Sequence, residues 1–226
     1  MSTLYIVSTP IGNLEDITLR AVRILKEVDL VACEDTRETK KLLTRYEISR
    51  PLISYNAHAS EAKHDEILGA LSDGKNVALV SDAGTPTISD PGSLLVSRVR
   101  AELPDVAVVP IPGPSALLAA LAASGFPSSD FLFLGFLPHK KGRETLFKEI
   151  ASSERTVVFY ESPHRILKTL ESLVAHLSGE RQIVVGRELT KLFEETKLGT
   201  ATELLRYYTD NPDKVRGEFA LVVHGF

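Results

Sequence analysis

The sequence predicts an α/β protein of two domains. Short runs rich in β-branched residues alternate with segments whose apolar residues recur at helical spacing, a pattern typical of strands joined by helices and of a largely parallel sheet. Residues 110–114 place three prolines around Gly113, which neither a helix nor a central strand accommodates. We therefore predict a boundary in this segment. It separates a mostly parallel N-terminal α/β domain at 1–112 from a mixed-sheet C-terminal α/β domain at 113–226.

The N-terminal half opens with a buried-looking strand followed by an amphipathic helix, in which Ile17, Ala21 and Ile24 keep helical spacing. The expected strands are 4–8, 30–33 and 76–81, the expected helices are 17–28, 36–46 and 58–71, and segments 94–103 and 106–109 complete the half. Because helix 58–71 carries many charges, we expect His58 and His64 to be solvated.

The C-terminal half begins with an Ala/Leu-rich helix at 115–123. The later helices are expected at 143–151, 163–177 and 202–208, the strands at 131–134, 156–160, 182–186 and 219–223, and a short hairpin around 193–199. Neither internal repeats nor low-complexity stretches interrupt this order.

The net charge of −4 argues against a protein that coats nucleic acid through a global positive field. The negative excess lies entirely in residues 1–113, so any RNA contact must come from local basic patches. Cys33 is the single cysteine, which excludes an internal disulfide and a cysteine-based zinc site, and we expect it to be a small core residue. The histidines are scattered, so we expect no metal site.

The sequence contains no apolar run near the roughly 20 residues that span a bilayer, and its start has no basic segment of the signal-peptide type. We therefore expect a cytoplasmic protein without a membrane partner. It also lacks G-x-G-x-x-G after the first strand, a Walker A motif and a G-x-S-x-G elbow, which argues against dinucleotide-binding, P-loop and esterase-type functions.

Polar loops follow several predicted strands, where ligands bind in open α/β sheets. They are residues 9–13, 81–92, 161–163 and 187–189. Any one of them could be an ordinary turn or helix cap. Loop 81–92 is longer than a tight turn requires and combines Asp82 and Asp90 with glycines and prolines. Of the four loops, it is therefore the one that we most expect to bind a ligand.

The chain also carries a series of ordered motifs. They are residues 4–14, Glu34-Asp35-Thr36-Arg37, residues 81–92, residues 110–116, Gly135-Phe136-Leu137-Pro138, residues 161–165, residues 187–191 and residues 214–218. In these motifs the chain resembles the tetrapyrrole methylase superfamily, and within it the branch that 2′-O-methylates a cytidine ribose in 16S ribosomal RNA. Ser8 stands where that branch has alanine. The alternatives are a corrin or sirohaem precursor methyltransferase on the same fold and a non-catalytic RNA-binding module.

The resemblance implies two α/β domains of the tetrapyrrole methylase type, with S-adenosylmethionine in the trough between them. The donor-binding residues that it implies are Pro10, Asp82, Gly84, Thr85, Ser115, Ala116, Tyr160 and Leu189. An aspartate can pair with the donor's ammonium or ribose hydroxyls, and a helix start offers amides to its carboxylate. The resemblance also implies a homodimer that acts on 16S rRNA or the 30S subunit.

A ribose hydroxyl is a poor nucleophile, so a base or a cation near the alkoxide would help transfer. The residues that could supply one are Glu34, Asp35, Glu161, Glu188 and Lys191, among which the sequence does not choose. The segment from Glu34 to Arg37 could equally be a helix cap with an ion pair. RNA contacts are expected from two basic patches, one formed by Arg37, Lys40, Lys41 and Arg45, the other by Lys140, Lys141 and Arg143.

Overall fold

The computed structural model describes residues 2–57 and 59–226. The chain divides into two compact units, Met1–Ser115 and Ala116–Phe226. The division between the units falls just after the proline-rich segment 110–114. His58, at the start of one predicted helix, lies outside the described residues. None of the helices in the described part of the chain is both long and apolar enough to cross a membrane.

The described part of the first unit forms a five-stranded parallel sheet with the strand order β3-β2-β4-β1-β5. Its strands are β1 Thr3–Val7, β2 Leu30–Cys33, β3 Leu52–Ser54, β4 Val77–Val80 and β5 Ala107–Ile111. Its helices are η1 Leu14–Asp16, α1 Leu19–Glu27, α2 Thr36–Arg45, α3 Glu61–Ser72 and α4 Ser93–Glu102.

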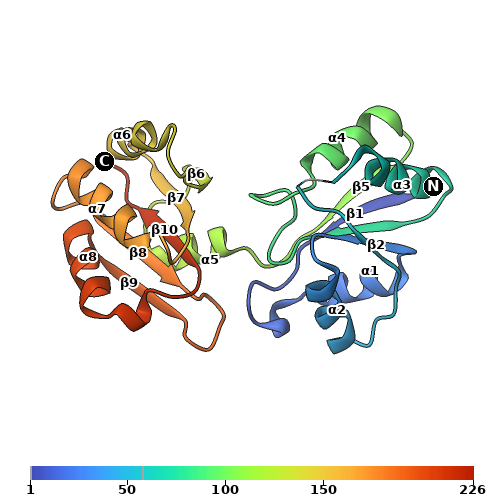
Figure 1. The fold of residues 1–226 in the computed structure, drawn as a ribbon, viewed down its shortest axis with the longest axis horizontal. Helices are drawn as coiled ribbons and strands as arrows, with labels where there is room; N and C mark the ends of the chain where they lie inside the picture. Colours follow the sequence, from blue (N-terminus) through green and yellow to red (C-terminus); the bar gives the residue numbers. More distant parts are fainter. Residues whose placement is uncertain (1, 58) are drawn as a thin grey trace. The chain divides into compact units, whose positions relative to one another are not determined.

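Helices cover both faces of this sheet, α1 and α2 on one and α3 and α4 on the other (Figure 1). In β4, Ala78 and Val80 join the core cluster of α1 and α2, whereas Val77 and Leu79 join that of α3 and α4. Every residue of β4 is therefore buried, as expected of a central parallel strand. Cys33 is completely buried, which confirms the prediction of a core residue, and burial raises the pKa of its thiol.

Two details of the sheet differ from the sequence prediction. The edge strand β3 was not predicted, because it is short and follows Pro51 directly. Pro110 was assigned to a turn but lies within β5, in register with Ile6 of β1. Since β5 pairs only with β1, one side of its backbone forms no ladder bonds, and a proline is tolerated on such an edge.

The expectation that His64 is solvated was wrong. His64 is buried, and its Nδ1 lies 3.4 Å from the hydroxyl of Tyr55, with the two rings edge to face. The reason is its position in α3, where His64, Leu68 and Leu71 share the inward face at helical spacing. The charges of this helix lie on its other faces.

The described residues of the second unit form a five-stranded mixed sheet with the order β6-β7-β10-β8-β9, in which β6 and β7 are parallel and the other neighbours antiparallel. Its strands are β6 Phe131–Phe136, β7 Thr156–Glu161, β8 Gln182–Arg187, β9 Glu195–Thr200 and β10 Phe219–Val223. Its helices are α5 Ala116–Ser124, α6 Arg143–Ser152, α7 Ile166–His176, α8 Ala201–Asp210 and η2 Pro212–Lys214.

Strand β10 shows how this sheet is covered. Phe219, Leu221 and Val223 pack into the cluster of α6, α7 and α8, whereas Ala220 and Val222 face α5. The α/β fold class predicted from the sequence is thus confirmed. The short hairpin expected around 193–199 is instead the second arm of a longer one, because β9 pairs with the whole of β8.

Replacing Leu221 tests the assignment of this core. Leu221 is fully buried between β7, β8 and the helices, so Leu221→Ala should lower the free energy of unfolding by about 2–5 kcal/mol. Leu192 is 90% exposed, and Leu192→Ala should change the free energy of unfolding by less than about 0.5 kcal/mol. Urea denaturation of both variants measures the two values, and equal losses would contradict the assignment.

Candidate functional site

In the first unit, the loop after β1 is bonded to the loop after β4. The amide of Thr9 donates to the carbonyl of Gly84 at 2.8 Å, and the amide of Gly84 returns a bond to Thr9 O at 3.0 Å. Thr9 Oγ1 also donates to the carbonyl of Ser81 at 3.0 Å. These bonds bring the predicted donor-binding residues Pro10 and Gly84 to one edge of the sheet.

A third loop, after β5, joins the same place. The hydroxyls of Ser8 and Thr85 lie 2.9 Å apart, and Thr85 Oγ1 donates to the carbonyl of Pro114 at 3.4 Å. A Cβ on Gly113 would lie 2.9 Å from the Cβ of Ser8, closer than side chains pack. Of the eight predicted donor-binding residues, Pro10, Asp82, Gly84, Thr85 and Ser115 therefore belong to loops at this one edge, which we call the β1–β4–β5 edge.

The backbone of loop 81–92 is strained. Gly84 and Gly92 have φ of 81° and 125°, and Thr87 and Ser89 have φ of 75° and 62°, values that residues with side chains rarely adopt. Strained backbone of this kind persists where the surrounding structure imposes it, often at ligand sites. At Gly84 an added Cβ would make an ordinary contact with Ile11 at 3.4 Å, so the positive φ is what disfavours a residue with a side chain there.

Carboxylates gather where β2 and β4 end. Asp82 Oδ1 accepts the amide of Asp35 at 3.0 Å, which ties the two strand ends together. Burial raises the pKa of Glu34, and the negative charges of Asp82 and Asp90 raise it further. Burial likewise raises the pKa of Asp82 and of Asp90. This group of carboxylates therefore favours binding of a positively charged ligand.

Asp35 behaves differently from its neighbours. It is the N-cap of α2, where its carboxylate accepts the amide of Arg37 at 2.8 Å and the guanidinium at 2.6 Å. The hydrogen bond from Arg37 lowers the pKa of Asp35 to about 2. The structure thus contains the helix cap with an ion pair that the sequence left open, and such a carboxylate is a weak base.

In the second unit, the predicted donor-binding residues lie on the α5 side of the sheet. The hydroxyl of Tyr160 accepts the amide of Leu117 at 3.0 Å, next to Ala116 at the start of α5. Tyr160 also packs edge to face on Phe133, and Leu189 belongs to the same cluster. Tyr160, Leu189 and Ala116 are therefore brought together.

Glu188 and Lys191 form a bonded set at the end of β8. Lys191 Nζ donates to Glu188 Oε1 at 2.9 Å and to Glu218 Oε2 at 2.8 Å. Burial alone would lower the pKa of Lys191, but its bonds to Glu218 and Glu188 outweigh burial and raise it. Lys191 is therefore a fixed cation and not a proton acceptor at neutral pH.

Gly217 and Glu218 belong to the 214–218 motif but were not among the predicted site residues. The amide of Glu218 donates to Glu188 Oε1 at 3.0 Å. Gly217 has a φ of 83°, and a Cβ there would lie 2.2 Å from Glu188 Cδ. The glycine is thus required by the close approach of Glu188, whose own φ of 50° is also positive.

Glu161 lies at the end of β7 and has no exposed side-chain surface. Its oxygens accept bonds from Ser162 N, Thr169 Oγ1 and the arginines at 143 and 165. We infer that it does not act as a base, since it is enclosed and fully bonded. Arg143 belongs to this network and is only 16% exposed, so it is turned away from the surface where RNA was expected.

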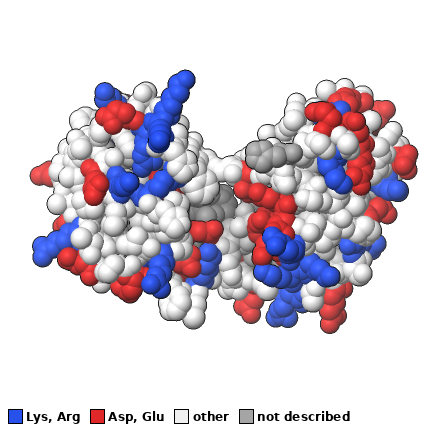
Figure 2. All heavy atoms as spheres, viewed as in Figure 1, with Lys and Arg blue, Asp and Glu red and all other residues white. Residues whose placement is uncertain are grey.

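The other predicted RNA-binding residues are exposed, namely Arg37, Lys40, Lys41 and Arg45 on α2 and Lys140 and Lys141 before α6. Some of their charge is compensated, because Arg37 pairs with Asp35 and Lys41 with Glu38. The lysines and arginines form separate groups among acidic ones on the face shown in Figure 2. This distribution of lysines and arginines is suited to local contacts with RNA and does not form a continuous basic surface on this face.

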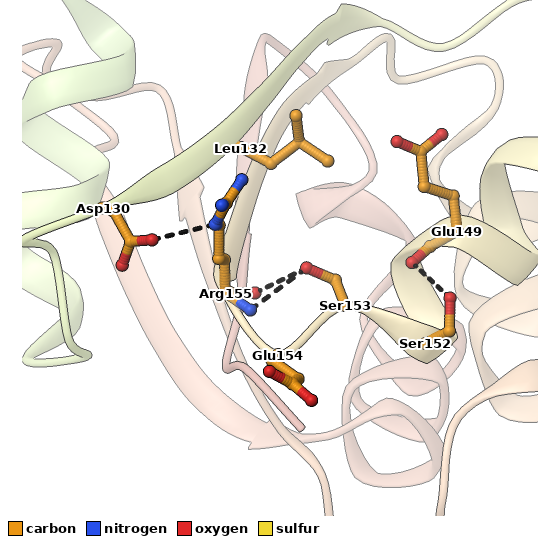
Figure 3. Close-up of a pocket in the computed structure, with 7 residues that line it drawn as sticks. All are labelled: Asp130, Leu132, Glu149, Ser152, Ser153, Glu154 and Arg155. Carbon is orange, nitrogen blue, oxygen red and sulfur yellow. Dashed lines mark hydrogen bonds and ion pairs between the residues drawn. The ribbon is translucent and has the colours of Figure 1, made fainter.

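A cavity of about 590 Å³ lies elsewhere in the second unit, and none of the predicted site residues line it. Figure 3 shows its lining between β6, the end of α6 and the start of β7. Arg155 is bonded there to Asp130 at 2.8 Å, beside the carboxylates Glu149 and Glu154. The residues are mostly exposed, and we assign no function to this cavity.

Comparison with known proteins identifies the family. The family model of the tetrapyrrole (corrin/porphyrin) methylases matches residues 3–205. Ribosomal RNA small subunit methyltransferase I of Synechocystis sp. is 49% identical over 226 residues, 100% of this chain and 80% of that protein. The protein of that name from Thermotoga maritima is 48% identical over 225 residues, 100% of this chain and 99% of that one.

Among solved structures, the cobalamin biosynthetic enzyme cobalt precorrin-4 methyltransferase superposes with a TM-score of 0.69 at 19% identity, covering 98% of this chain and 94% of that one. At this identity the likeness shows a shared fold and no shared substrate. With the family model matching most of its length, the chain belongs to the tetrapyrrole (corrin/porphyrin) methylase family.

Proposed function

We propose that this protein transfers a methyl group from S-adenosylmethionine to the 2′-hydroxyl of a cytidine in 16S ribosomal RNA. The observation that carries the proposal is the identity of 48–49%, over the whole chain, to proteins named ribosomal RNA small subunit methyltransferase I. We further propose that it acts in the cytoplasm, as a homodimer, on the 30S subunit. The fold likeness to a precorrin methyltransferase carries no substrate argument at 19% identity.

The β1–β4–β5 edge fits the methyl donor. Gly84, with its positive φ, gives the space for close backbone approach, and Asp82 offers a carboxylate to an ammonium or a ribose hydroxyl. We propose Pro10, Thr85 and Ser115 as further contacts from this unit, and Ala116, Tyr160 and Leu189 as contacts from the other. The donor supplies an activated methyl group, so the protein mainly has to orient the donor and acceptor.

For the acceptor, we propose Glu34 as the base that takes the hydroxyl proton. The alternative is Lys191, a cation that would stabilise the developing alkoxide. Glu34 is favoured over Asp35 because burial and its carboxylate neighbours raise its pKa, whereas the bond from Arg37 lowers that of Asp35. Glu188 is assigned to holding Lys191 at 2.9 Å.

RNA binding is proposed for the exposed residues Lys140 and Lys141 and for the exposed basic face of α2. Arg143 is left out, because its guanidinium is bonded to Thr169 Oγ1 at 2.6 Å and to Pro138 O at 3.2 Å. With a net charge of −4, a few phosphate contacts must supply most of the affinity.

The donor site is tested by Asp82→Ala and Gly84→Val. Both should weaken S-adenosylmethionine binding, by about 1–3 kcal/mol where the charged hydrogen bond of Asp82 is lost. Isothermal titration calorimetry measures the affinity, with circular dichroism as the check of folding. The matched control is Asp105→Ala, which removes an exposed carboxylate just before β5, at the opposite end of the strands. Donor affinity that equals that of the control would move the site elsewhere.

The ribose assignment is tested with a 30S subunit whose target cytidine carries a 2′-deoxy sugar. Methyl transfer should be abolished, because the accepting hydroxyl is missing, while binding falls only modestly since phosphates supply most of it. Methylation mapped on the normal and the 2′-deoxy subunits gives the answer. Transfer that persists on the 2′-deoxy subunit excludes a ribose acceptor. Transfer to a corrin precursor and none to 30S would favour the tetrapyrrole alternative, and failure to bind the donor would favour a non-catalytic RNA-binding module.

The electrostatics of Glu34 predict a pH-dependent stability. Its pKa is higher in the folded than in the unfolded state, so its ionised form destabilises the fold above the folded pKa, and this cost disappears as the pH falls below the unfolded pKa. Glu34→Gln should therefore be more stable than the natural protein at about pH 7, with the difference shrinking toward about pH 4. As a base variant it should also lose about 10²–10⁴ in kcat. A stability difference that does not change with pH would contradict the electrostatic argument.

A further inference from the structure

The buried carboxylate of Glu161 holds two arginines that come from different segments. Arg165 Nη2 lies 2.6 Å from Oε1, and Arg143 Nη2 lies 3.4 Å from Oε2. The hydroxyl of Thr169 donates to Oε2 at 2.6 Å and also accepts a bond from Arg143 at 2.6 Å. Each member therefore keeps the others in place, and a buried charge of this kind requires all its partners.

Both arginines extend from Glu161 to the start of the basic loop, residues 139–142. Arg165 Nη1 donates to the carbonyl of Leu137 at 2.7 Å, and Arg143 Nη1 donates to that of Pro138 at 3.2 Å. Arg143 also directly follows the loop, and its amide donates to Lys140 O at 3.2 Å. The loop is thus fastened before its first residue and after its last.

The fastened loop presents an exposed basic sequence. His139, Lys140 and Lys141 are exposed, and Gly142 turns the chain into α6 with a φ of 82°. Lysine side chains on a fixed backbone lose less conformational freedom when they bind phosphate than lysines on a mobile one. By fixing the backbone of the loop, the hydrogen-bond network of Glu161 raises the affinity of the loop for an anion without contacting that anion.

We propose that Glu161 is a positioning residue for RNA: through Arg143 and Arg165 it fixes the basic loop so that Lys140 and Lys141 meet the phosphates of the substrate. This inference rests on the proposed function for its ligand. Glu161 is thus assigned to substrate binding, through the basic loop, and not to the transfer of the methyl group.

A double-mutant cycle tests the proposal with 30S subunits as the probe. Its variants are Glu161→Gln, the pair Lys140→Gln with Lys141→Gln, and all three changes together. The lysine pair should weaken binding and flatten the slope of log affinity against log salt by about one to two units. Glu161→Gln should weaken binding by about tenfold, the ordering cost of two side chains, and raise KM with little change in kcat. The triple variant should bind no more weakly than the lysine pair.

A buried arginine provides the matched control for general loss of stability. Arg181 is buried and donates to the carbonyls of Ala151, Ser153 and His224, none of which belongs to the loop. Arg181→Met should lower the melting temperature and leave RNA affinity unchanged. If Glu161→Gln does not fold, Thr169→Val removes a hydroxyl bonded to both Glu161 and Arg143, and a smaller effect in the same direction is expected.

The outcomes separate the inference from the proposed function. Additive losses in the triple variant, or unchanged RNA affinity in Glu161→Gln, would overturn the positioning role. If the natural protein neither binds nor methylates 30S, the proposed function fails, and hydrogen exchange at the amides of Arg143 and Leu146, which donate to Lys140 O and Gly142 O, still tests whether Glu161 fixes the loop. Exchange in Glu161→Gln should be at least about tenfold faster than in the natural protein and in Arg181→Met. Equal exchange would overturn the inference.

Discussion

The reciprocal backbone bonds between Thr9 and Gly84 are the constraint on which the first unit depends. Parallel strands end at the same edge of a sheet, but each loop there leads into its own helix and has no inherent reason to touch its neighbour. The two bonds join the loops after β1 and β4, and Thr85 extends the connection to Pro114 after β5. Gly84 has a positive φ at this junction, and the donor-binding residues proposed from this unit gather around it.

Carboxylates have opposite roles in the two units because their partners differ. Near the ends of β2 and β4, Glu34, Asp82 and Asp90 lie close to one another, and burial raises the pKa of each. In the second unit, Glu161 and Glu188 are bonded to cations and backbone amides. The first arrangement keeps negative charge available for a cationic ligand or a proton, whereas the second uses it to fix loops.

The sequence predicted the α/β class and the post-strand loops because both follow from local patterns of apolar and turn-forming residues. It did not distinguish Glu34 from Glu161, since both are glutamates at the end of a strand. Their difference depends on partners distant in the chain, such as Arg143 for Glu161. His64 was misassigned for a related reason: the charges of helix α3 are visible in the sequence, but the face that packs on the sheet is decided by the neighbouring core.

The burial of Cys33 makes the protein a convenient background for labelling with thiol reagents. It is the single cysteine, no part of it is exposed, and its raised pKa keeps the unreactive thiol form at neutral pH. A cysteine introduced at an exposed position such as His139 would therefore react alone, without prior removal of the natural one. Fluorescent or spin probes attached in this way report on one chosen segment, and a gain of reaction at Cys33 itself reports that the sheet around it has opened.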